Sequence, residues 1–485
     1  MNHSSLSQNV IRGGLWVGIG FVGQQGFAVI RTMLLARLLT PEDFGQLALV
    51  TLTIFAGMML TEVSLESAII QRTELPSSFL HTAWTMMVLR GITLFLFIQI
   101  TAPWIAQVFD HPQVETLLRV GAVSFLLVSL STVSMALLLR EMRYRSRVVL
   151  DGSREIIGGL FAIVLALLFE NAWALLLGLL IGQAAALIGV WFFHPYRPRL
   201  LLDREAISHY WRFGCHLYVS GVLTYVVTRG ADLTVGKLLG LRGLGHYQMV
   251  SGMAEIMTRG LSGTVSQVVL PAYTQLTAEG RSVADVFEEV WRILLYLLLP
   301  ITAILFLFHN QVVILILGEQ WIPSALTLAI LVVGQALRAL AASCGTLILS
   351  AGKTKYLSRI KVVEATCFIL FIVPMVKLWG LPGAASCFAL VYSVSLIGHL
   401  YAAQQIAPIV IRILHRTGEP LAVTLLGAAF VWHLGLEGLM NAFICILLWS
   451  GMWVGYVWLR QASLLRRIWG GIPGFLPPNP GFKIV

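Results

Sequence analysis

The sequence predicts an all-α integral membrane protein with about 14 transmembrane helices, arranged as two six-helix lobes around a central cavity plus two extra C-terminal helices. The first reason is composition. The 485 residues are 58% apolar and only 12% charged, and the mean hydropathy is +0.83, whereas a soluble domain carries roughly 25% charged residues. The second reason is that apolar residues gather in segments of about 20, the length of a membrane-spanning helix. The third is an internal repeat at an offset of about 200 residues.

The apolar segments follow one another with short polar connections. The first begins directly after the polar stretch MNHSSLSQNV and Arg12, and it is too long for the apolar part of a signal peptide, so we expect it in the mature protein. The longest connection is HPYRPRLLLDREAISHY, so no soluble domain is expected. The predicted spans are 13–37, 44–68, 79–104, 114–139, 149–169, 171–193, 211–237, 244–270, 287–308, 323–350, 359–378, 383–407, 420–437 and 441–460.

Basic residues are unevenly divided between the two sides that these spans define. With the N-terminus in the cytoplasm, 23 of the 33 Lys and Arg residues fall in cytoplasmic segments or at cytoplasmic helix ends, while five fall on the opposite side and five within spans. The positive-inside rule therefore predicts an even number of spans with both termini cytoplasmic. The net charge of +10 then reflects topology and contact with anionic membrane lipid, so no nucleic-acid partner is expected.

Two short motifs recur in the second half of the chain. RLLTPEDFGQL at 37–47 aligns with KLLGLRGLGHY at 237–247, and the stretch Tyr144-Arg-Ser-Arg matches Tyr356-Leu-Ser-Arg. Six helices in each half give both halves the same orientation, so the repeat predicts lobes related by an axis along the membrane normal. The predicted domains are an N-terminal lobe at 1–195, a cytoplasmic linker at 196–210, a C-terminal lobe at 211–407, two additional helices at 408–469 and a flexible Gly/Pro-rich tail at 470–485.

We place ten ionisable side chains at membrane depth within the predicted spans. A charge at the centre of a bilayer costs roughly 2.5 to 3.5 kcal/mol on insertion scales, so such residues face a protein interior or a water-filled cavity. Gln24 and Arg31 are seven residues apart and therefore share one helix face. Glu364 lies near a helix end, where we expect it to reach the interface. The ten residues are Arg31, Arg90, Arg229, Arg259, Arg338, Glu62, Glu66, Asp232, Glu255 and Glu364.

Arginines and carboxylates in one cavity suit the binding of an anion together with a cation. A guanidinium holds phosphate or carboxylate oxygens bidentately and stays charged, while a partly desolvated carboxylate can take a proton or bind a cation. The alternative is that the charges form structural pairs, as Glu255 and Arg259 could at i, i+4. The predicted substrate-binding residues are Arg31, Arg90, Arg229, Arg259, Arg338 and Gln24. The candidate ion-coupling residues are Glu62, Glu66, Asp232 and Glu255.

The sequence predicts neither catalytic residues nor a cofactor. The five cysteines lie in apolar runs without CxxC spacing or a neighbouring histidine cluster, so we expect core residues instead of disulfides or metal ligands. A GxxxxGK[ST] phosphate-binding loop is absent, which gives ATP hydrolysis no support. The loop FDHPQVE at 109–115 carries two carboxylates and a histidine, and we interpret it as a solvated turn.

The run ARLLTPEDFGQLALV, followed by Glu62, Glu66 and AIIQR, resembles the polysaccharide exporters of the multidrug/oligosaccharidyl-lipid/polysaccharide superfamily, of the colanic-acid-exporter or lipopolysaccharide O-unit flippase type. The resemblance implies a transporter of the bacterial inner membrane that is not an enzyme. Its substrate would be an oligosaccharide on undecaprenyl pyrophosphate, moved from the cytoplasmic to the periplasmic leaflet by alternating access. Related lipid II flippases use arginines on helices 1, 3 and 8, which here carry Arg31, Arg90 and Arg259. Further implied partners are H⁺ or Na⁺ and a polymerase or export machinery.

Two other functions stay open at this point. A multidrug exporter of the same superfamily would bind an apolar cation, and the five intramembrane arginines disfavour it. A membrane polysaccharide polymerase or glycosyltransferase would need a catalytic loop outside the bilayer, whereas the outward loops here are short.

Overall fold

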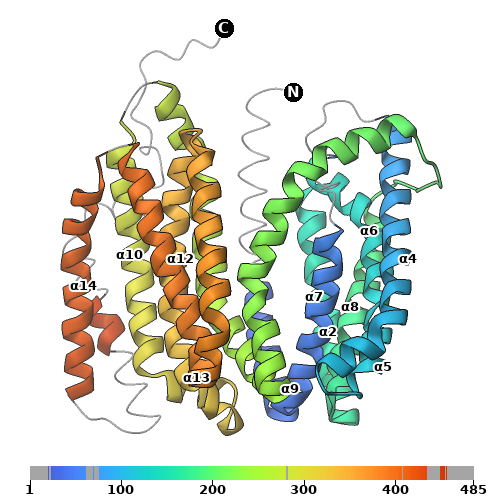
Figure 1. Cartoon of the computed structure of the whole chain (residues 1–485), viewed down its shortest axis with the longest axis horizontal. Helices are drawn as coiled ribbons and strands as arrows, with labels where there is room; N and C mark the ends of the chain where they lie inside the picture. The colour runs from blue at the N-terminus through green and yellow to red at the C-terminus, as the bar shows by residue number, and fades with distance from the viewer. Residues whose placement is uncertain are drawn as a thin grey trace. The chain divides into compact units, whose positions relative to one another are not determined.

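The computed structural model describes residues 20, 23–61, 69, 76–141, 143–279, 282–406, 408–433, 448–453 and 455. Within them, the side chains of 209, 211–224, 257–268, 271–272, 277–278, 410–411, 414, 416 and 430–433 are not described. The described part contains helices and no strand, and eight of its helices are long and apolar enough to cross a membrane (Figure 1). The predicted all-α membrane fold is confirmed, and the number of 14 spans stays a prediction.

The helices follow the order of the predicted spans. After a helix at 23–38 come α2 Pro41–Leu60, α4 Ser77–Val108, α5 Val114–Gly121, α6 Val123–Arg140, α7 Tyr144–Phe169, α8 Ala172–Phe193, α9 Arg204–Ala278, α10 Ala284–Leu307, α11 His309–Ile316, the 3₁₀ helix η1 Glu319–Ser324, α12 Ala325–Ser350, α13 Thr354–Gln404 and α14 Val410–His433.

Two of these helices each contain two predicted spans. Helix α9 includes 211–237 and 244–270, and it is interrupted at Gly240, where φ is 71° and ψ is −177°. Helix α13 is interrupted at Gly380, where φ is 64°. Glycine populates positive φ without the steric cost that a Cβ atom brings, so it lets the chain change direction without a loop.

The described residues form two compact units that alternate along the chain. The first unit contains the residues up to 255 together with 313–334 and 358–395, and the second contains 256–312, 335–357 and the residues from 396 onward. Segments from the second half of the sequence therefore belong to the first unit. The predicted domain boundaries stay predictions.

Helix α2 begins with a capping box that explains its start. The backbone N–H of Asp43 donates to Thr40 Oγ1 at 3.3 Å, and the backbone N–H of Thr40 donates to Asp43 Oδ2 at 3.0 Å. Pro41 occupies the first helical position, where its missing N–H costs nothing. The helix therefore starts three residues before the predicted span at 44–68.

The two copies of the first repeated motif meet within the first unit. A Cβ atom at Gly45 would collide with the backbone oxygen of Leu241, and one at Gly245 would collide with the backbone oxygen of Pro41. The two contacts exchange when 200 is added to or subtracted from the residue numbers. This is the contact that a two-fold relation between the motifs would produce.

The 3₁₀ helix η1 docks on the end of the helix at 23–38, also within the first unit. Trp321 is fully buried, and its indole N–H donates to the carbonyl of Ala36 at 2.9 Å. The amide of Gln320 donates to the carbonyls of Ala36 at 2.6 Å and Leu39 at 3.1 Å. These bonds satisfy carbonyls that the end of a helix leaves without an intrahelical partner. The Trp321 ring lies edge-on to Phe44, with ring centroids 5.4 Å apart.

The second unit has its own core between α10, α12 and α14. Phe287, Trp291, Leu347 and Ile413 are buried together, and the Trp291 indole donates to Thr417 Oγ1 at 3.1 Å.

Of the cysteines, Cys344, Cys367 and Cys387 carry free thiols and the first and last of them are buried, as predicted. Cys445 and the side chain of Cys215 lie outside the described part.

Candidate functional site

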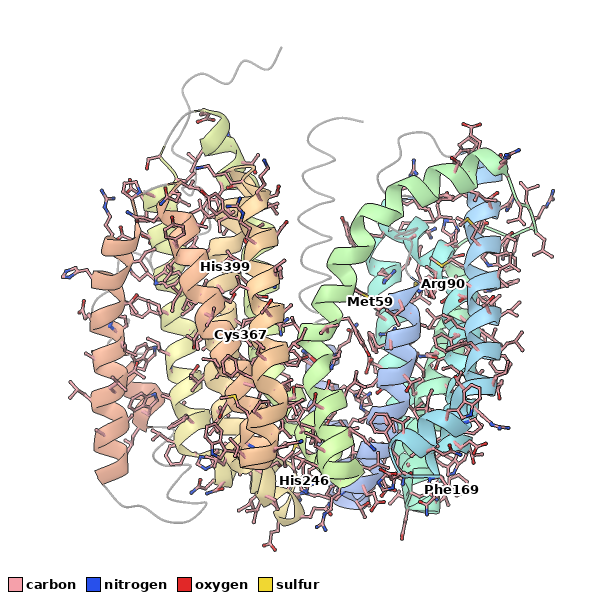
Figure 2. The ribbon with its side chains drawn as sticks, in the orientation of Figure 1. Met59, Arg90, Phe169, His246, Cys367 and His399 are labelled. Atoms are coloured by element: carbon pink, nitrogen blue, oxygen red, sulfur yellow. The ribbon has the colours of Figure 1, made fainter. Side chains whose placement is uncertain are left out.

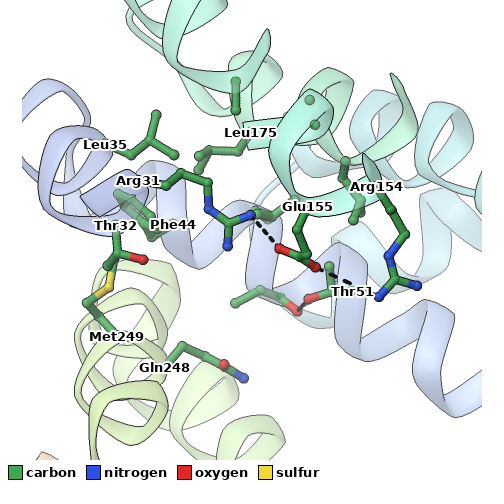
Figure 3. A pocket seen from close by; sticks show the side chains of 16 residues that line it. Arg31, Thr32, Leu35, Phe44, Thr51, Arg154, Glu155, Leu175, Gln248 and Met249 are labelled. Carbon is green, nitrogen blue, oxygen red and sulfur yellow. Dashed lines mark hydrogen bonds and ion pairs between the residues drawn. The ribbon is translucent and has the colours of Figure 1, made fainter. Parts of the chain in front are cut away.

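A pocket of about 280 Å³ with a mainly apolar lining and three charged side chains lies within the first unit (Figure 3). It is lined by residues of the helix at 23–38 and of α2, α7, α8 and α9. Of the described residues that line it, only Arg31, Arg154 and Glu155 are charged. The polar residues Thr32, Thr51 and Gln248 add neutral hydrogen-bonding groups. The pocket thus combines two guanidinium groups and one carboxylate.

Glu155 lies between the two arginines. Its Oε2 accepts a hydrogen bond from Arg31 Nη1 at 2.9 Å, and its Oε1 is 3.8 Å from Arg154 Nη2. Figure 3 shows the carboxylate pointing toward both groups. The side chains of Arg31 and Glu155 are 30% and 32% exposed, so they are accessible from the pocket while the ion pair remains partly desolvated.

Glycine at position 159 lets Arg31 lie against α7. A Cβ atom there would be 2.8 Å from Arg31 Cδ and 2.6 Å from the ring of Phe27. The aliphatic part of Arg31 therefore crosses α7 at Gly159, and the guanidinium reaches Glu155 one turn earlier on that helix. About two turns nearer the start of α7 than Glu155, Gln24 Nε2 donates to the Val148 carbonyl at 3.5 Å. Gln24 and Arg31 thus share the face that faces α7, as the spacing predicts.

Small residues hold α7 and α8 close together beneath this pocket. A Cβ atom at Gly158 would lie 2.8 Å from the Gly178 carbonyl oxygen, and one at Gly182 would lie 2.5 Å from the Arg154 carbonyl oxygen. Such close approach of two backbones is typical of small-residue packing in membrane helices. It fixes the part of α7 from which Arg154 and Glu155 extend.

Arg90, predicted to join Arg31 in the cavity, is not among the residues that line this pocket. It extends from α4 to the C-terminal end of α2, where it donates to Thr61 Oγ1 at 2.7 Å and to the carbonyl of Met58. Figure 2 shows Arg90 at about the height of Met59 and far from His246. A cation at a helix C-terminus stabilises the exposed carbonyls and the helix dipole.

Arg229 and Asp232 form a pair within α9. Their side chains are 3.5 Å apart, and the Arg229 guanidinium lies over the ring of Phe55 at 5.6 Å. Asp232 is buried. A charge pair in this setting has a structural partner within its own helix, so its geometry alone does not require a ligand.

The remaining predicted residues are distributed over both units. Glu255 and Arg338 each have an interaction partner, and neither lines the pocket. Glu62 and Glu66 lie outside the described residues, and the side chain of Arg259 is not described.

Glu364, which we expected to reach the interface, is instead buried within the protein. Its side chain is 1% exposed and accepts hydrogen bonds from Lys361 Nζ and Ser395 Oγ, each at 2.6 Å. Helix α13 begins at Thr354, so Glu364 lies nearly three turns inside the helix and not at its end.

Arg154 and Glu155 are the charged pocket residues for which the sequence analysis predicts no binding role. The predicted span starts at 149, whereas α7 starts at Tyr144, so Glu155 lies about three turns inside the helix. Asp151, Arg154 and Glu155 all lie within the predicted span at 149–169, and a charged residue within a membrane span is the signal that could have identified Glu155. Among the described residues, no group of three or more His, Cys, Asp or Glu side chains could hold a metal ion.

Known proteins resemble this chain in both sequence and fold. A family model described as polysaccharide biosynthesis protein matches residues 34–326. The lipopolysaccharide biosynthesis protein WzxC of Escherichia coli (strain K12) is 23% identical over 395 residues, which are 81% of this chain and 80% of WzxC. The lipid II flippase MurJ in an inward closed conformation superposes with a TM-score of 0.79 at 12% identity, covering 93% of this chain and all of MurJ.

A second solved structure carries the superfamily name. An inward-facing multidrug resistance MATE family transporter of the MOP superfamily superposes with a TM-score of 0.59 at 13% identity, over 80% of this chain and 95% of that one. At these identities the two structures show a common fold, whereas the substrate depends on the residues of the site.

Proposed function

This chain belongs to the polysaccharide biosynthesis protein family, and from that membership we propose that it is a flippase for lipid-linked oligosaccharide. It is a multi-pass protein of the bacterial inner membrane. The proposed substrate is a saccharide on undecaprenyl pyrophosphate, carried from the cytoplasmic to the periplasmic leaflet by alternating access. Such a protein needs to compensate the charge of a pyrophosphate within the membrane without performing chemistry on it.

The pocket around Arg31 is the observation that supports this proposal most directly. Two guanidinium groups share one carboxylate in a cavity of about 280 Å³. A guanidinium binds phosphate oxygens through two parallel hydrogen bonds, so the pair suits a pyrophosphate better than an apolar cation. A multidrug exporter that binds an apolar cation would need an excess of negative charge in this pocket, whereas the charged lining residues give an excess of positive charge.

Cation coupling is a further part of the proposal. Asp232 and Glu255 extend from α9 within the first unit, and Glu62 and Glu66 are the other candidates. Carboxylates in such surroundings can exchange H⁺ or Na⁺ during the transport cycle. Vesicles with imposed H⁺ or Na⁺ gradients test this role, and equal transport with and without both gradients would remove it.

The flippase function is tested by lipid analysis of cells depleted of the protein. We expect undecaprenyl-linked saccharide units to accumulate on the cytoplasmic leaflet, and the wild-type gene to reverse this. A block in polymer length without accumulation would support a polymerase instead. Depleted cells with a normal distribution of lipid-linked saccharide would contradict the proposal.

Arg31→Lys connects the function to the pocket. Lysine keeps the charge but loses the bidentate fork, so flipping should slow by about tenfold or more while the protein stays in the membrane. Arg119→Lys is the matched control, because Arg119 pairs with Glu115 at 2.7 Å and does not line the pocket. Equal flipping by both variants would show that this pocket does not hold the pyrophosphate.

A further inference from the structure

We propose that Glu155 is an internal counter-anion, which occupies the phosphate-binding side of Arg31 and is displaced when the substrate phosphate binds. The inference rests on the proposed function, because it assigns a role to the carboxylate of the same pocket. Glu155 would then be a positioning residue that acts through the arginines. It would set how tightly the pocket holds its anionic ligand.

The geometry of the ion pair is that of an exchangeable ligand. The contact between Arg31 Nη1 and Glu155 Oε2, at 2.9 Å, has the length of a charge-assisted hydrogen bond. A carboxylate and a phosphate present oxygen pairs that suit the same guanidinium fork. The two anions therefore compete for one position. A phosphate entering the pocket meets Arg31 already paired with a group of similar shape.

The charge balance of the pocket leaves room for an anion. The described lining residues carry two positive charges and one negative charge. Arg154 Nη2 is 3.8 Å from Glu155 Oε1, too far for a full hydrogen bond. Arg154 is also 47% exposed, so its donors are available to a ligand. One carboxylate thus compensates two guanidiniums only in part, and a phosphate would complete the compensation.

The pair can rearrange without disturbing the core. Arg31 and Glu155 are each about one-third exposed, and their helices are fixed by other contacts, including the close approach of Gly158 to α8. When a phosphate takes Arg31, the Glu155 carboxylate can remain near the neighbouring Arg154. Gln248 faces the pocket from α9 and adds an amide donor.

In a transporter that alternates between substrate-bound and substrate-free states, this exchange of anions keeps Arg31 paired in both states. An arginine left without a counter-charge at membrane depth is costly, and so is one that never releases its ligand. With Glu155 present, Arg31 is paired both with and without substrate. The carboxylate lowers the affinity for phosphate and favours release, so binding strength and transport rate should change in opposite directions when it is removed.

The variant Glu155→Gln tests whether pyrophosphate affinity and transport rate change in opposite directions. We expect the purified full-length variant to bind inorganic pyrophosphate about tenfold more tightly than the wild type, measured by calorimetry in lipid nanodiscs. Flipping of the lipid-linked saccharide in reconstituted vesicles should be slower, because release becomes limiting. Glu115→Gln is the matched control, because Glu115 also pairs with an arginine and is 35% exposed but lies outside the pocket. We expect it to change neither quantity.

Two more variants separate the possible failures. If Glu155→Gln does not accumulate, Glu155→Asp keeps the charge but shortens the side chain away from Arg31, and it should also bind pyrophosphate more tightly. Arg31→Gln should lose pyrophosphate binding. If it does and the Glu155 variants bind no more tightly than the wild type, the counter-anion role is overturned while the proposed function stands. If Arg31→Gln binds as the wild type does, the pyrophosphate assignment of the pocket is itself wrong, and the counter-anion role is overturned with it.

Discussion

At the scale of single residues, the pocket depends on the charged side chain of Arg31 and on Gly159, which has no side chain and so leaves space for it. The sequence identifies Arg31, because an arginine inside an apolar segment is costly and needs a polar partner. It does not identify that partner, because Glu155 is 124 positions away and only the packing of two helices brings it near. Gly159 has no periodic or compositional signal either, since its role is to leave space for Arg31.

Gly159→Ala should therefore impair transport more than it impairs folding. The new methyl group would lie 2.6 Å from the Phe27 ring and 2.8 Å from Arg31 Cδ, so both side chains must shift and the contact of Arg31 with Glu155 is disturbed. Displacing a binding group by about 1 Å can cost up to about 100-fold in rate, and we expect flipping to fall roughly tenfold or more. The measurement is flipping in reconstituted vesicles at matched protein amounts. Gly26→Ala is the control, because nothing lies within 4 Å of its added Cβ. Undiminished flipping by Gly159→Ala would show that the position of Arg31 along α7 is unimportant.

At the scale of elements, the length of the apolar segments predicts the helices well but does not predict where a helix is interrupted by a residue with positive φ. Where the predicted spans fall on described residues they lie mainly in helices, because about 20 apolar residues can satisfy their backbone within a bilayer only as a helix. Most of the predicted span at 441–460 lies outside the described residues. Gly240 and Gly380 join pairs of spans without a loop, and no hydropathy pattern reports a positive φ. The 3₁₀ helix Glu319–Ser324 also lacks a periodic pattern, although its docking fixes an end of the helix at 23–38.

Trp321→Ala should destabilise the first unit. The substitution removes a fully buried indole and its hydrogen bond to the Ala36 carbonyl, and a buried Trp→Ala change costs about 3 to 5 kcal/mol. We expect less protein in the membrane and a lower thermal midpoint in detergent. Trp104→Ala is a fitting comparison, because Trp104 on α4 is 62% exposed. Equal midpoints for the two variants would mean that the η1 contact contributes little to stability.

At the scale of the whole molecule, composition and charge distribution carry most of what the sequence predicts. Low charge and long apolar segments identify a helical membrane protein, and the 23 basic residues on one side predict its orientation. The units follow from tertiary contacts, so residues 313–334 join the first unit although they lie deep in the second half of the sequence.

Both termini are expected in the cytoplasm. Single cysteines placed after Met1 and at Val485 should react with a membrane-permeant maleimide and stay protected from an impermeant one in intact cells. A cysteine at Lys237, on the predicted opposite side, should react with both reagents. Labelling of position 485 from outside would contradict the even number of spans.

The reciprocal contact of Gly45 and Gly245 also bears on the ancestry of the chain. A polypeptide of half the length, carrying one copy of the motif, would pair with an identical copy through the same two contacts and form a symmetric homodimer. Fusion of two such genes would keep this interface while freeing each copy to diverge. The divergence is visible at the position before each paired carbonyl. Thr40 caps the start of α2 with its side chain, whereas its counterpart Gly240 has no side chain and turns the backbone at positive φ. Such a fusion would make these two ways of starting a helix descendants of one ancestral position, on either side of an interface that has kept its glycines.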